Sequence, residues 1–318
     1  MITGRYRNAR VAVVYGGLSN ERAVSLVTGA AIAKALTERR YDVTLINAGR
    51  DLPARLVAER IDVVYNALHG TYGEDGRLPG LLDWMGLPYT GEDLAASLLS
   101  FDKVLAKQQF RARGLPVAAD VVWTPADAEL RTVDDLPFPL PVAVKPVAEG
   151  SSVGVTLVRE AAAFDEAIRR AQPGRVLIEE MIIGPELSVA CLGEEVLGSV
   201  EIEPAREFYD YEAKYGNAGT RYHLPPRLSA EDIAKVESIA LAAHLALGCV
   251  GATRTDIMLG RTGPVLIEVN TLPGMTPTSL VPKIAAARGM AFGDLMEAIL
   301  DHARCSGPPG PGEVRDGR

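Results

Sequence analysis

The first third of the chain alternates strand and helix signals, and this alternation restricts the fold more than any other feature. The apolar run Arg10–Tyr15 ends in two glycines, and Ser19 or Asn20 can cap a helix that continues to about Leu36. Two more strand candidates, rich in β-branched residues, follow at Tyr41–Asn47 and Ile61–Leu68. The order strand, helix, strand, strand predicts an α/β unit with a largely parallel sheet.

The remainder of the chain is dominated by strands with few helices between them. The expected strands are Val142–Lys145, Val153–Val158, Val176–Ile183, Glu186–Leu192, Val196–Glu203, Ala252–Leu259 and Val265–Asn270. The expected helices are Leu98–Gly114, Ala161–Ala171, a helix from the capping box Ser229–Asp232 to Leu247, and the mostly helical Leu280–His302. This pattern predicts antiparallel α+β structure after the parallel unit.

Composition excludes several classes of protein. With 33 basic and 41 acidic residues the net charge is 33 − 41 = −8, which is unsuited to a nucleic-acid binder that relies on a broad positive field. Apolar runs are shorter than the roughly 20 residues that a membrane span needs. The cysteines at 191, 249 and 305 are few and contain no CxxC pair, as in proteins of a reducing compartment. We therefore expect a soluble cytoplasmic protein.

Two consecutive strands suggest a metal site. If Leu259 pairs with Val265, then Asp256 lies opposite Glu268 and Arg254 lies opposite Asn270, all on one face of the sheet. The same alternation places Ile267 on the other face. Two carboxylates directly opposite each other repel unless a cation lies between them, and hard oxygen ligands suit Mg²⁺. The structural alternative is an exposed polar face on which Arg254 bridges the acids.

Lysine is informative here because the sequence contains only seven lysines against 26 arginines. Lys145 ends an apolar strand, where a buried lysine needs an anionic partner. Glu149–Gly154 follows, and its glycines and serines can donate hydrogen bonds to a phosphate. Alone, such a loop is more often a hairpin turn; beside Lys145 and a candidate Mg²⁺ site we favour phosphate binding.

Two further lysines have plain structural alternatives. Lys103 lies near the start of a helix, where a surface lysine is ordinary. Lys214 lies in the irregular stretch Arg206–Pro226 together with several tyrosines. A loop of this length is typical of a lid that closes over a charged ligand, although tyrosines also serve local packing.

Acidic residues mark two other places. Val176–Glu186 is an apolar stretch with acids, which are either exposed strand residues or contacts to a nucleotide's ribose. Glu21 begins a helix, where an acid complements the helix dipole or anchors a substrate ammonium. His69 follows a strand at the position where α/β sites usually lie, and it is as easily structural as functional.

Several segments in this order resemble the D-alanine–D-alanine ligases of the ATP-grasp superfamily, from about Arg10 to Ala303. The segments that carry the resemblance are Gly16–Ser25, Ala67–Gly70, Gly73–Gly76, Lys145–Pro146, Glu149–Gly154, Phe208–Tyr215, Arg254–Asp256, Glu268–Gly274 and Pro277–Leu280. Each is moderately specific, and together they are highly specific.

The resemblance implies a fold and an activity. The fold would have three domains: residues 1–97, largely parallel α/β and binding the first D-alanine; 98–181; and 182–305, with a lid at about 206–226. The last two would be α+β and hold ATP between them, and 306–318 would be a mobile tail. The enzyme would join two D-alanines through an acyl phosphate, with release of ADP and phosphate, for peptidoglycan synthesis. It implies two Mg²⁺ or Mn²⁺, leaves a monovalent cation open, and suggests a homodimer by analogy alone.

The resemblance also implies residue roles. Catalytic roles go to Glu21, Ser151, Tyr215, Arg254 and Gly274, with Arg254 and the Gly274 N–H at the oxyanion. Substrate contacts go to His69, Ser279 and Leu280. ATP contacts go to Lys103, Lys145, Glu179, Glu180, Ile182, Glu186 and Lys214, with Glu179 and Glu186 at adenine and ribose. Metal ligands would be Asp256, Glu268 and Asn270.

Departures and rivals remain. Glu180 stands where some family members carry a lysine beside adenine, and Thr253 stands where a smaller residue is usual. The nearest rivals are ligases whose acceptor is D-lactate or D-serine, and Tyr215 favours D-alanine because the family links a lid tyrosine to dipeptide formation. A nucleotide-binding module without turnover would not need Arg254. A Rossmann dehydrogenase would need a GxGxxG motif, which the sequence lacks.

Overall fold

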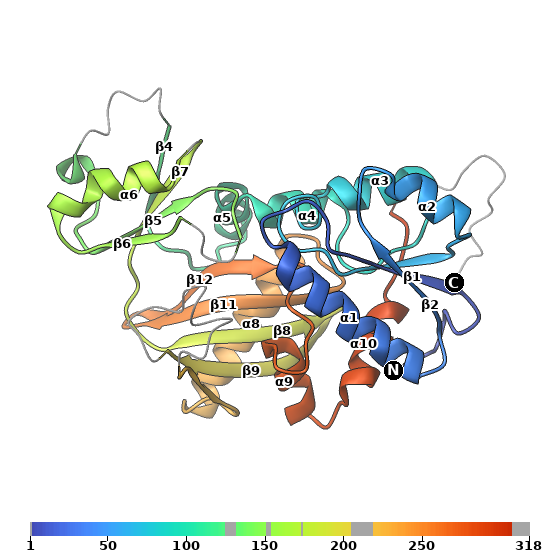
Figure 1. Ribbon diagram of the computed structural model, residues 1–318. Coiled ribbons are helices and arrows are strands. Elements are labelled where there is room, and N and C mark those ends of the chain that lie inside the picture. The colour runs from blue at the N-terminus through green and yellow to red at the C-terminus, as the bar shows by residue number, and fades with distance from the viewer. Residues whose placement is uncertain (1, 125–131, 151–153, 173, 205–218, 307–318) are drawn as a thin grey trace.

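The strands form three separate sheets (Figure 1). The computed structural model describes residues 2–124, 132–150, 154–172, 174–204 and 219–306. One sheet is parallel and two are antiparallel. The parallel sheet comes first in the chain, then the four-stranded and the five-stranded sheet. The expected mixture of a parallel α/β unit and two α+β units is confirmed.

The parallel sheet has the strand order β2–β1–β3. Its elements are β1 (Arg10–Tyr15), α1 (Arg22–Glu38), β2 (Asp42–Asn47), α2 (Leu52–Ala58), β3 (Val63–Asn66) and α3 (Arg77–Met85). The sequence analysis missed α2 and α3. Helix α2 is the crossover that a parallel connection from β2 to β3 requires. Neither Ser19 nor Asn20 caps α1, because the N-cap position is Glu21.

Both faces of this sheet are buried, as expected of parallel strands. Val11 and Val13 of β1 contribute to one hydrophobic cluster, and Ala12 and Val14 contribute to another. Helices α2 and α3 supply the second cluster. The first contains residues of α1 and, from the far end of the chain, of α9 (Leu280–Ala287) and α10 (Phe292–Asp301). The first and last parts of the chain therefore share one core.

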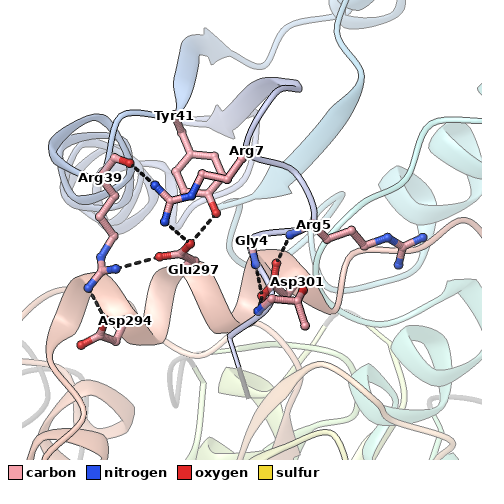
Figure 2. A network of polar contacts seen from close by, with 9 residues as sticks. Gly4, Arg5, Arg7, Arg39, Tyr41, Asp294, Glu297 and Asp301 are labelled. Carbon is pink, nitrogen blue, oxygen red and sulfur yellow. Dashed lines mark hydrogen bonds and ion pairs between the residues drawn. The ribbon is translucent and has the colours of Figure 1, made fainter.

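Buried Glu297 fastens α10 to the parallel unit (Figure 2). Its carboxylate accepts hydrogen bonds from Tyr41 at 2.8 Å and Arg39 at 2.7 Å, and it also pairs with Arg7. One turn further along α10, Asp301 accepts from the backbone N–H of Arg5 at 2.9 Å. The stretch 280–302 is mostly helical, as expected, and residues 288–291 separate α9 from α10.

The four-stranded sheet has the order β4–β7–β5–β6, and α6 (Phe164–Arg170) packs on β6. Its strands are β4 (Asp120–Trp123), β5 (Val142–Pro146), β6 (Thr156–Val158) and β7 (Val176–Glu180). Strand β4 was not expected, and β7 ends earlier than predicted. The helix expected over Leu98–Gly114 is two helices, α4 (Leu94–Phe101) and α5 (Lys103–Ala112). Asp102 separates them, because its extended backbone ends α4 and its carboxylate caps the first N–H groups of α5.

The five-stranded sheet has the order β10–β9–β8–β11–β12 and lies below the four-stranded sheet in Figure 1. Its strands are β8 (Glu186–Leu192), β9 (Glu195–Glu203), β10 (Arg221–His223), β11 (Ala252–Gly260) and β12 (Gly263–Asn270). Helix α8 (Ala230–Ala246) is capped by Ser229, as predicted, and packs on this sheet. Strand β10 lies inside the stretch 206–226, which was expected to be irregular; residues 205–218 lie outside the described residues.

The hairpin of β11 and β12 has the predicted register at its charged end only. Asp256 pairs with Glu268 and Arg254 pairs with Asn270, as expected. A β-bulge then shifts the register, so Leu259 pairs with Pro264 and not with Val265. Ile267 is the extra residue of the bulge, and the prediction that it faces away from the charged residues is wrong.

Two further findings concern the chain as a whole. Across the residues that the structure describes, no helix has the length and apolar character that crossing a membrane requires. Cys191, Cys249 and Cys305 form no disulfide, and the Cys305 thiol lies 3.5 Å from Oδ1 of Asp83. Of the expected tail 306–318, only Ser306 is described, and its backbone N–H donates to Asp83 at 2.7 Å.

Candidate active site

A cavity of about 340 Å³ is lined by residues of both antiparallel sheets. Of the residues predicted to bind ATP, those that line it are Lys145, Glu179, Glu180, Ile182 and Glu186. Ala143, Leu157, Met258 and Ile267 add apolar surface. Ile267 reaches the cavity because of the bulge in β12. A site with apolar walls and a few charged groups is typical of small-molecule binding.

Glu179 lies at the charged wall of this cavity and is only 4% exposed. One of its oxygens accepts a hydrogen bond from Lys145, and the other accepts one from Lys107 of α5. Burial alone would raise the pKa of Glu179, but the two lysines lower it to about 2. The side chain of Glu179 is therefore an anion that two lysines share, and the predicted contact to adenine or ribose stays a prediction.

Lys103 connects this wall to the charged hairpin. Its ammonium donates to the carbonyl of Glu149, at the start of the glycine-rich loop, at 2.7 Å. The same ammonium lies 4.0 Å from Glu268 of β12. Lys103 is the first residue of α5. Its ammonium therefore lies where the start of α5, the glycine-rich loop and the hairpin of β11 and β12 come together.

The predicted metal ligands lie together at the end of the hairpin. The Asn270 amide nitrogen lies 3.3 Å from Asp256 Oδ2 and 3.4 Å from Glu268 Oε1. Arg254 forms a bidentate ion pair with Asp256, in which Nε donates to Oδ1 at 2.9 Å and Nη2 donates to Oδ2 at 2.8 Å. Ser188 of β8 also donates to Asp256. The predicted oxygen ligands are therefore grouped, and Arg254 pairs with one of the two acids, so the metal site stays a prediction.

The donor set fits a hard divalent cation. Within the described ranges there is no cluster of three or more His, Cys, Asp or Glu side chains that would hold a metal by itself. The hairpin offers two carboxylates and one amide, which suits Mg²⁺ because this ion usually keeps water and substrate phosphates as its other ligands. The Asn270 amide would turn its oxygen toward such an ion.

Glu21 and His69 belong to a second group of predicted site residues, on the parallel α/β unit. Gly70 and Gly150 both approach the Glu21 carboxylate so closely that a Cβ atom would lie 2.3 Å and 2.8 Å from its Oε2. Ser19 donates to the carbonyl of His69 at 2.7 Å. The N-terminal turn, the segment after β3 and the glycine-rich loop therefore meet at Glu21.

The His69 ring is buried and held from both sides. Its Nε2 lies 3.1 Å from the hydroxyl of Thr28, and its Nδ1 lies 3.5 Å from Glu74. Both partners fix the orientation of the ring. Thr28 and Glu74 were not singled out in the sequence, where nothing marks them as neighbours of His69.

Gly274 and Ser279 are also neighbours. A Cβ on Gly274 would lie 3.1 Å from the Ser279 hydroxyl, which accepts from the Thr276 N–H at 3.1 Å. Ser279 is the N-cap of α9, and Leu280 is the first residue of that helix. The N–H groups of a helix start attract carboxylates. The remaining predicted residues, Ser151, Lys214 and Tyr215, lie outside the described residues.

Lys107, which lies behind Glu179, is one of the charged residues near the site that the sequence analysis missed. It is 2% exposed and also lies 3.1 Å from Asp120 of β4. Its signal was the spacing from Lys103, because residues four apart share a helix face. In a chain with seven lysines, that spacing was informative.

Two family models match the chain. The model for the D-ala D-ala ligase C-terminus matches residues 110–301, and that for the D-ala D-ala ligase N-terminus matches residues 50–92. A D-alanine–D-alanine ligase of Anaeromyxobacter sp. (strain Fw109-5) is 50% identical over 303 residues, covering 94% of this chain and 98% of the relative. That of Geotalea uraniireducens is 45% identical, covering 94% and 97%.

Solved structures agree with these matches. A D-alanine–D-alanine ligase from Bacillus anthracis, complexed with ATP, has a TM-score of 0.81 at 31% identity and covers 92% of this chain and 97% of its own. The VanG D-Ala:D-Ser ligase from Enterococcus faecalis has a TM-score of 0.79 at 28% identity, covering 92% and 99%.

With a cavity between two antiparallel sheets and a charged hairpin beside it, the molecule has the architecture of an ATP-grasp enzyme. The similarity extends over nearly the whole chain in sequence as well as in structure. This chain belongs to the D-alanine–D-alanine ligase family.

Proposed function

We propose that this enzyme joins two D-alanines to D-alanyl-D-alanine at the expense of ATP. The first carboxylate attacks the γ-phosphorus, ADP leaves, and an acyl phosphate forms. The second amine, after losing a proton, attacks the acyl carbon and expels phosphate. The observation that carries the proposal is the cavity between the two antiparallel sheets. Lys145 lies in its charged wall and Ile267 in its apolar wall. Glu268, a predicted metal ligand, follows Ile267 directly in β12. Phosphoryl transfer needs mainly positioning and neutralisation of charge, which this arrangement can supply.

The nucleotide would lie in the cavity with its base between the apolar residues. Main-chain groups near Glu180 and Ile182 would meet adenine, and Glu186 would meet the ribose hydroxyls. Lys103 and Lys145 would hold the α- and β-phosphates. Lys214 is proposed for the γ-phosphate by resemblance alone. The charged wall and the apolar wall of the cavity support this orientation.

Asp256, Glu268 and Asn270 would hold two Mg²⁺ or Mn²⁺ ions. When bound, these ions would neutralise phosphate charge and fix the geometry of the polyphosphate. Arg254 and the Gly274 N–H would stabilise the oxyanion of the tetrahedral intermediate. The pairing of Arg254 with Asp256 supports the role, because it holds the guanidinium at the charged end of the hairpin.

The first D-alanine would place its ammonium at Glu21, with His69 beside it. The second carboxylate would bind at Ser279 and Leu280, where α9 begins. Ser151 and Tyr215 are proposed to connect the lid to Glu21, and the approach of Gly150 to the Glu21 carboxylate supports that connection.

The acceptor is the open part of the proposal. D-alanine is favoured by the relatives, which are named for it, whereas the VanG neighbour is named for D-serine. The deciding experiment is phosphate release from ATP and Mg²⁺ with D-alanine, D-serine, D-lactate, L-alanine or no substrate, with products identified by mass. We expect release that depends on D-alanine and gives D-alanyl-D-alanine. Folded protein that binds ATP without such turnover would refute the ligase assignment.

Three further expectations concern the oligomeric state, the cellular location and the division into domains. We expect a homodimer by family analogy, which sedimentation would test. Cysteines that form no disulfide and the need for ATP support a cytoplasmic location. Each sheet falls within one of the proposed domains 1–97, 98–181 and 182–305, which supports that division.

A further inference from the structure

Three largely buried charges lie in a row, of which the first two, Lys145 and Glu179, line the cavity. Lys145 of β5 binds one oxygen of Glu179 on β7, and Lys107 of α5 binds the other. The exposed fractions of the side chains are 12% for Lys145, 5% for Glu179 and 3% for Lys107. A carboxylate that is shared in this way cannot fully neutralise either lysine.

The sheet explains why a lysine is needed at position 107. Strands β4 and β7 are neighbours, and Asp120 lies directly opposite Glu179. Two buried carboxylates at paired positions repel each other. Lys107 contacts both, and Arg111 contacts Asp120 as well. Lys107 therefore compensates the negative charge on the side of Glu179 away from Lys145.

The contact between Lys107 and Glu179 affects the charge of Lys145, because Lys145 binds the other oxygen of Glu179. Burial lowers the pKa of a lysine, yet Glu179 raises the pKa of Lys145 above its ordinary value, so this ammonium stays charged. If Lys107 were absent, Glu179 could turn both oxygens to Lys145. A lysine fully paired with a buried carboxylate has less attraction left for a phosphate.

We propose that Lys107 is a positioning residue, which holds Glu179 so that Lys145 keeps positive charge available for the polyphosphate of the nucleotide. This inference rests on the proposed contact between Lys145 and a phosphate. Lys107 itself need not touch the nucleotide, since it is not among the residues that line the cavity.

The test compares the affinity for ATP with Mg²⁺, measured by calorimetry, among the wild type, Lys107→Met, Glu179→Gln and the double variant, all as the full chain. Lys107→Met should weaken binding about tenfold or more, the scale of one buried charge contact. Lys107→Met with Glu179→Gln should bind ATP more tightly than Lys107→Met alone, because the competing carboxylate is gone. In the Glu179→Gln background, removal of Lys107 should change the affinity less than about twofold.

Controls separate this role from general structure. Lys34→Met removes an exposed lysine of α1, 78% exposed at its side chain, and should bind ATP like the wild type. If Lys107→Met does not fold, the comparison of Glu179→Gln with the double variant still decides. Additive losses in the double variant would overturn the proposal, because they would mean that Lys107 acts independently of Glu179.

Lys145→Met separates this inference from the proposed function. Unchanged ATP binding in Lys145→Met would refute the phosphate contact itself. Weaker binding in Lys145→Met together with unaltered binding in Lys107→Met would overturn only the inference about Lys107. The affinity for D-alanine should be unaffected in Lys107→Met, because the charge row lies at the nucleotide cavity.

Discussion

Glu92 shows how much a single buried residue can depend on pH. It is 2% exposed, and its two oxygens accept from the backbone N–H groups of Val250 at 2.7 Å and Gly251 at 2.9 Å. Burial raises its pKa to about 7, although these bonds and Arg304 oppose the rise. Glu92 thereby joins the parallel unit to the start of β11.

The raised pKa predicts a specific pH dependence for Glu92→Gln. The folded state holds this proton more tightly than the unfolded chain, so the stabilisation is complete below pH 4.5 and is lost as pH rises through about 7. A rise of the pKa from 4.5 to about 7 corresponds to about 3 kcal/mol in the free energy of unfolding. Urea unfolding at pH 5 and pH 8 should show Glu92→Gln costing more stability at pH 5.

The control for Glu92 is Glu38→Gln, because Glu38 is exposed at the end of α1. Its effect should be small and equal at both pH values. A cost of Glu92→Gln that does not change between pH 5 and pH 8 would show that the folded protein does not raise the pKa of this carboxyl.

At the scale of elements, the bulge in β12 matters most for the site. It keeps Leu266 in the core beside Ile257 while Glu268 stays opposite Asp256, and it turns Ile267 into the cavity. Regular alternation cannot produce all three placements at once.

Ile267→Ala should therefore weaken nucleotide binding with little effect on folding. Loss of the apolar contact is expected to raise the KM for ATP about threefold to tenfold and to leave the KM for D-alanine unchanged. Steady-state kinetics with each substrate varied in turn checks this. Val265→Ala, on the same strand but outside the cavity lining, is the matched variant, and an equal change there would contradict the assignment.

The attachment of α10 gives a second prediction at this scale. Glu297 is 1% exposed at its side chain and holds Arg7, Arg39 and Tyr41. Glu297→Gln leaves two arginines without their buried partner and should lower the free energy of unfolding by about 3 kcal/mol. Asp294→Asn removes the ion pair between Asp294 and Arg39, which is more exposed than the pairs of Glu297. In the same denaturation experiment it should lower the free energy of unfolding by at most about 1 kcal/mol. Equal costs would contradict this account.

The sequence predicted the elements with strong local patterns and missed those that tertiary contacts create. β1 and β8 have the expected bounds, and the pairing of Asp256 with Glu268 followed from simple alternation. The break at Asp102 was missed because a capping acid inside a helical pattern looks like a surface residue. The short helix α2 has too few residues for a clear period.

For the site, the same limit applies to residues whose role depends on distant partners. Glu92 and Lys107 carry no motif, and their significance comes from burial beside segments far along the chain. Glu21 was identified as a candidate because it begins a helix, and His69 because it follows a strand where α/β sites usually lie. Their contacts with Gly150 and Thr28 could be found only in the structure.

For the whole molecule, the position of the cavity between two sheets predicts that nucleotide stabilises the folded state. ATP with Mg²⁺ at a hundred times its Kd should add about 2.7 kcal/mol to the free energy of unfolding. A thermal melt should show a higher midpoint, with protection from hydrogen exchange in β7 and β11. Lys145→Met should lose most of the rise, and D-alanine without nucleotide should give a smaller one. An equal rise in Lys145→Met would contradict the proposed orientation of ATP.

The shared core of the first sheet and α10 has a consequence for synthesis on the ribosome. Val11, Val13 and Tyr65 pack against Leu295 and other residues of α10. The distance from the end of β3 at position 66 to the end of α10 at position 301 is 301 − 66 = 235 residues. Helix α1 covers part of this face, and at roughly 5–20 residues per second the remainder stays uncovered for about 10–50 s until α10 is synthesised. The uncovered part is apolar, so we expect the unfinished chain to present a chaperone-binding surface that the completed protein no longer has.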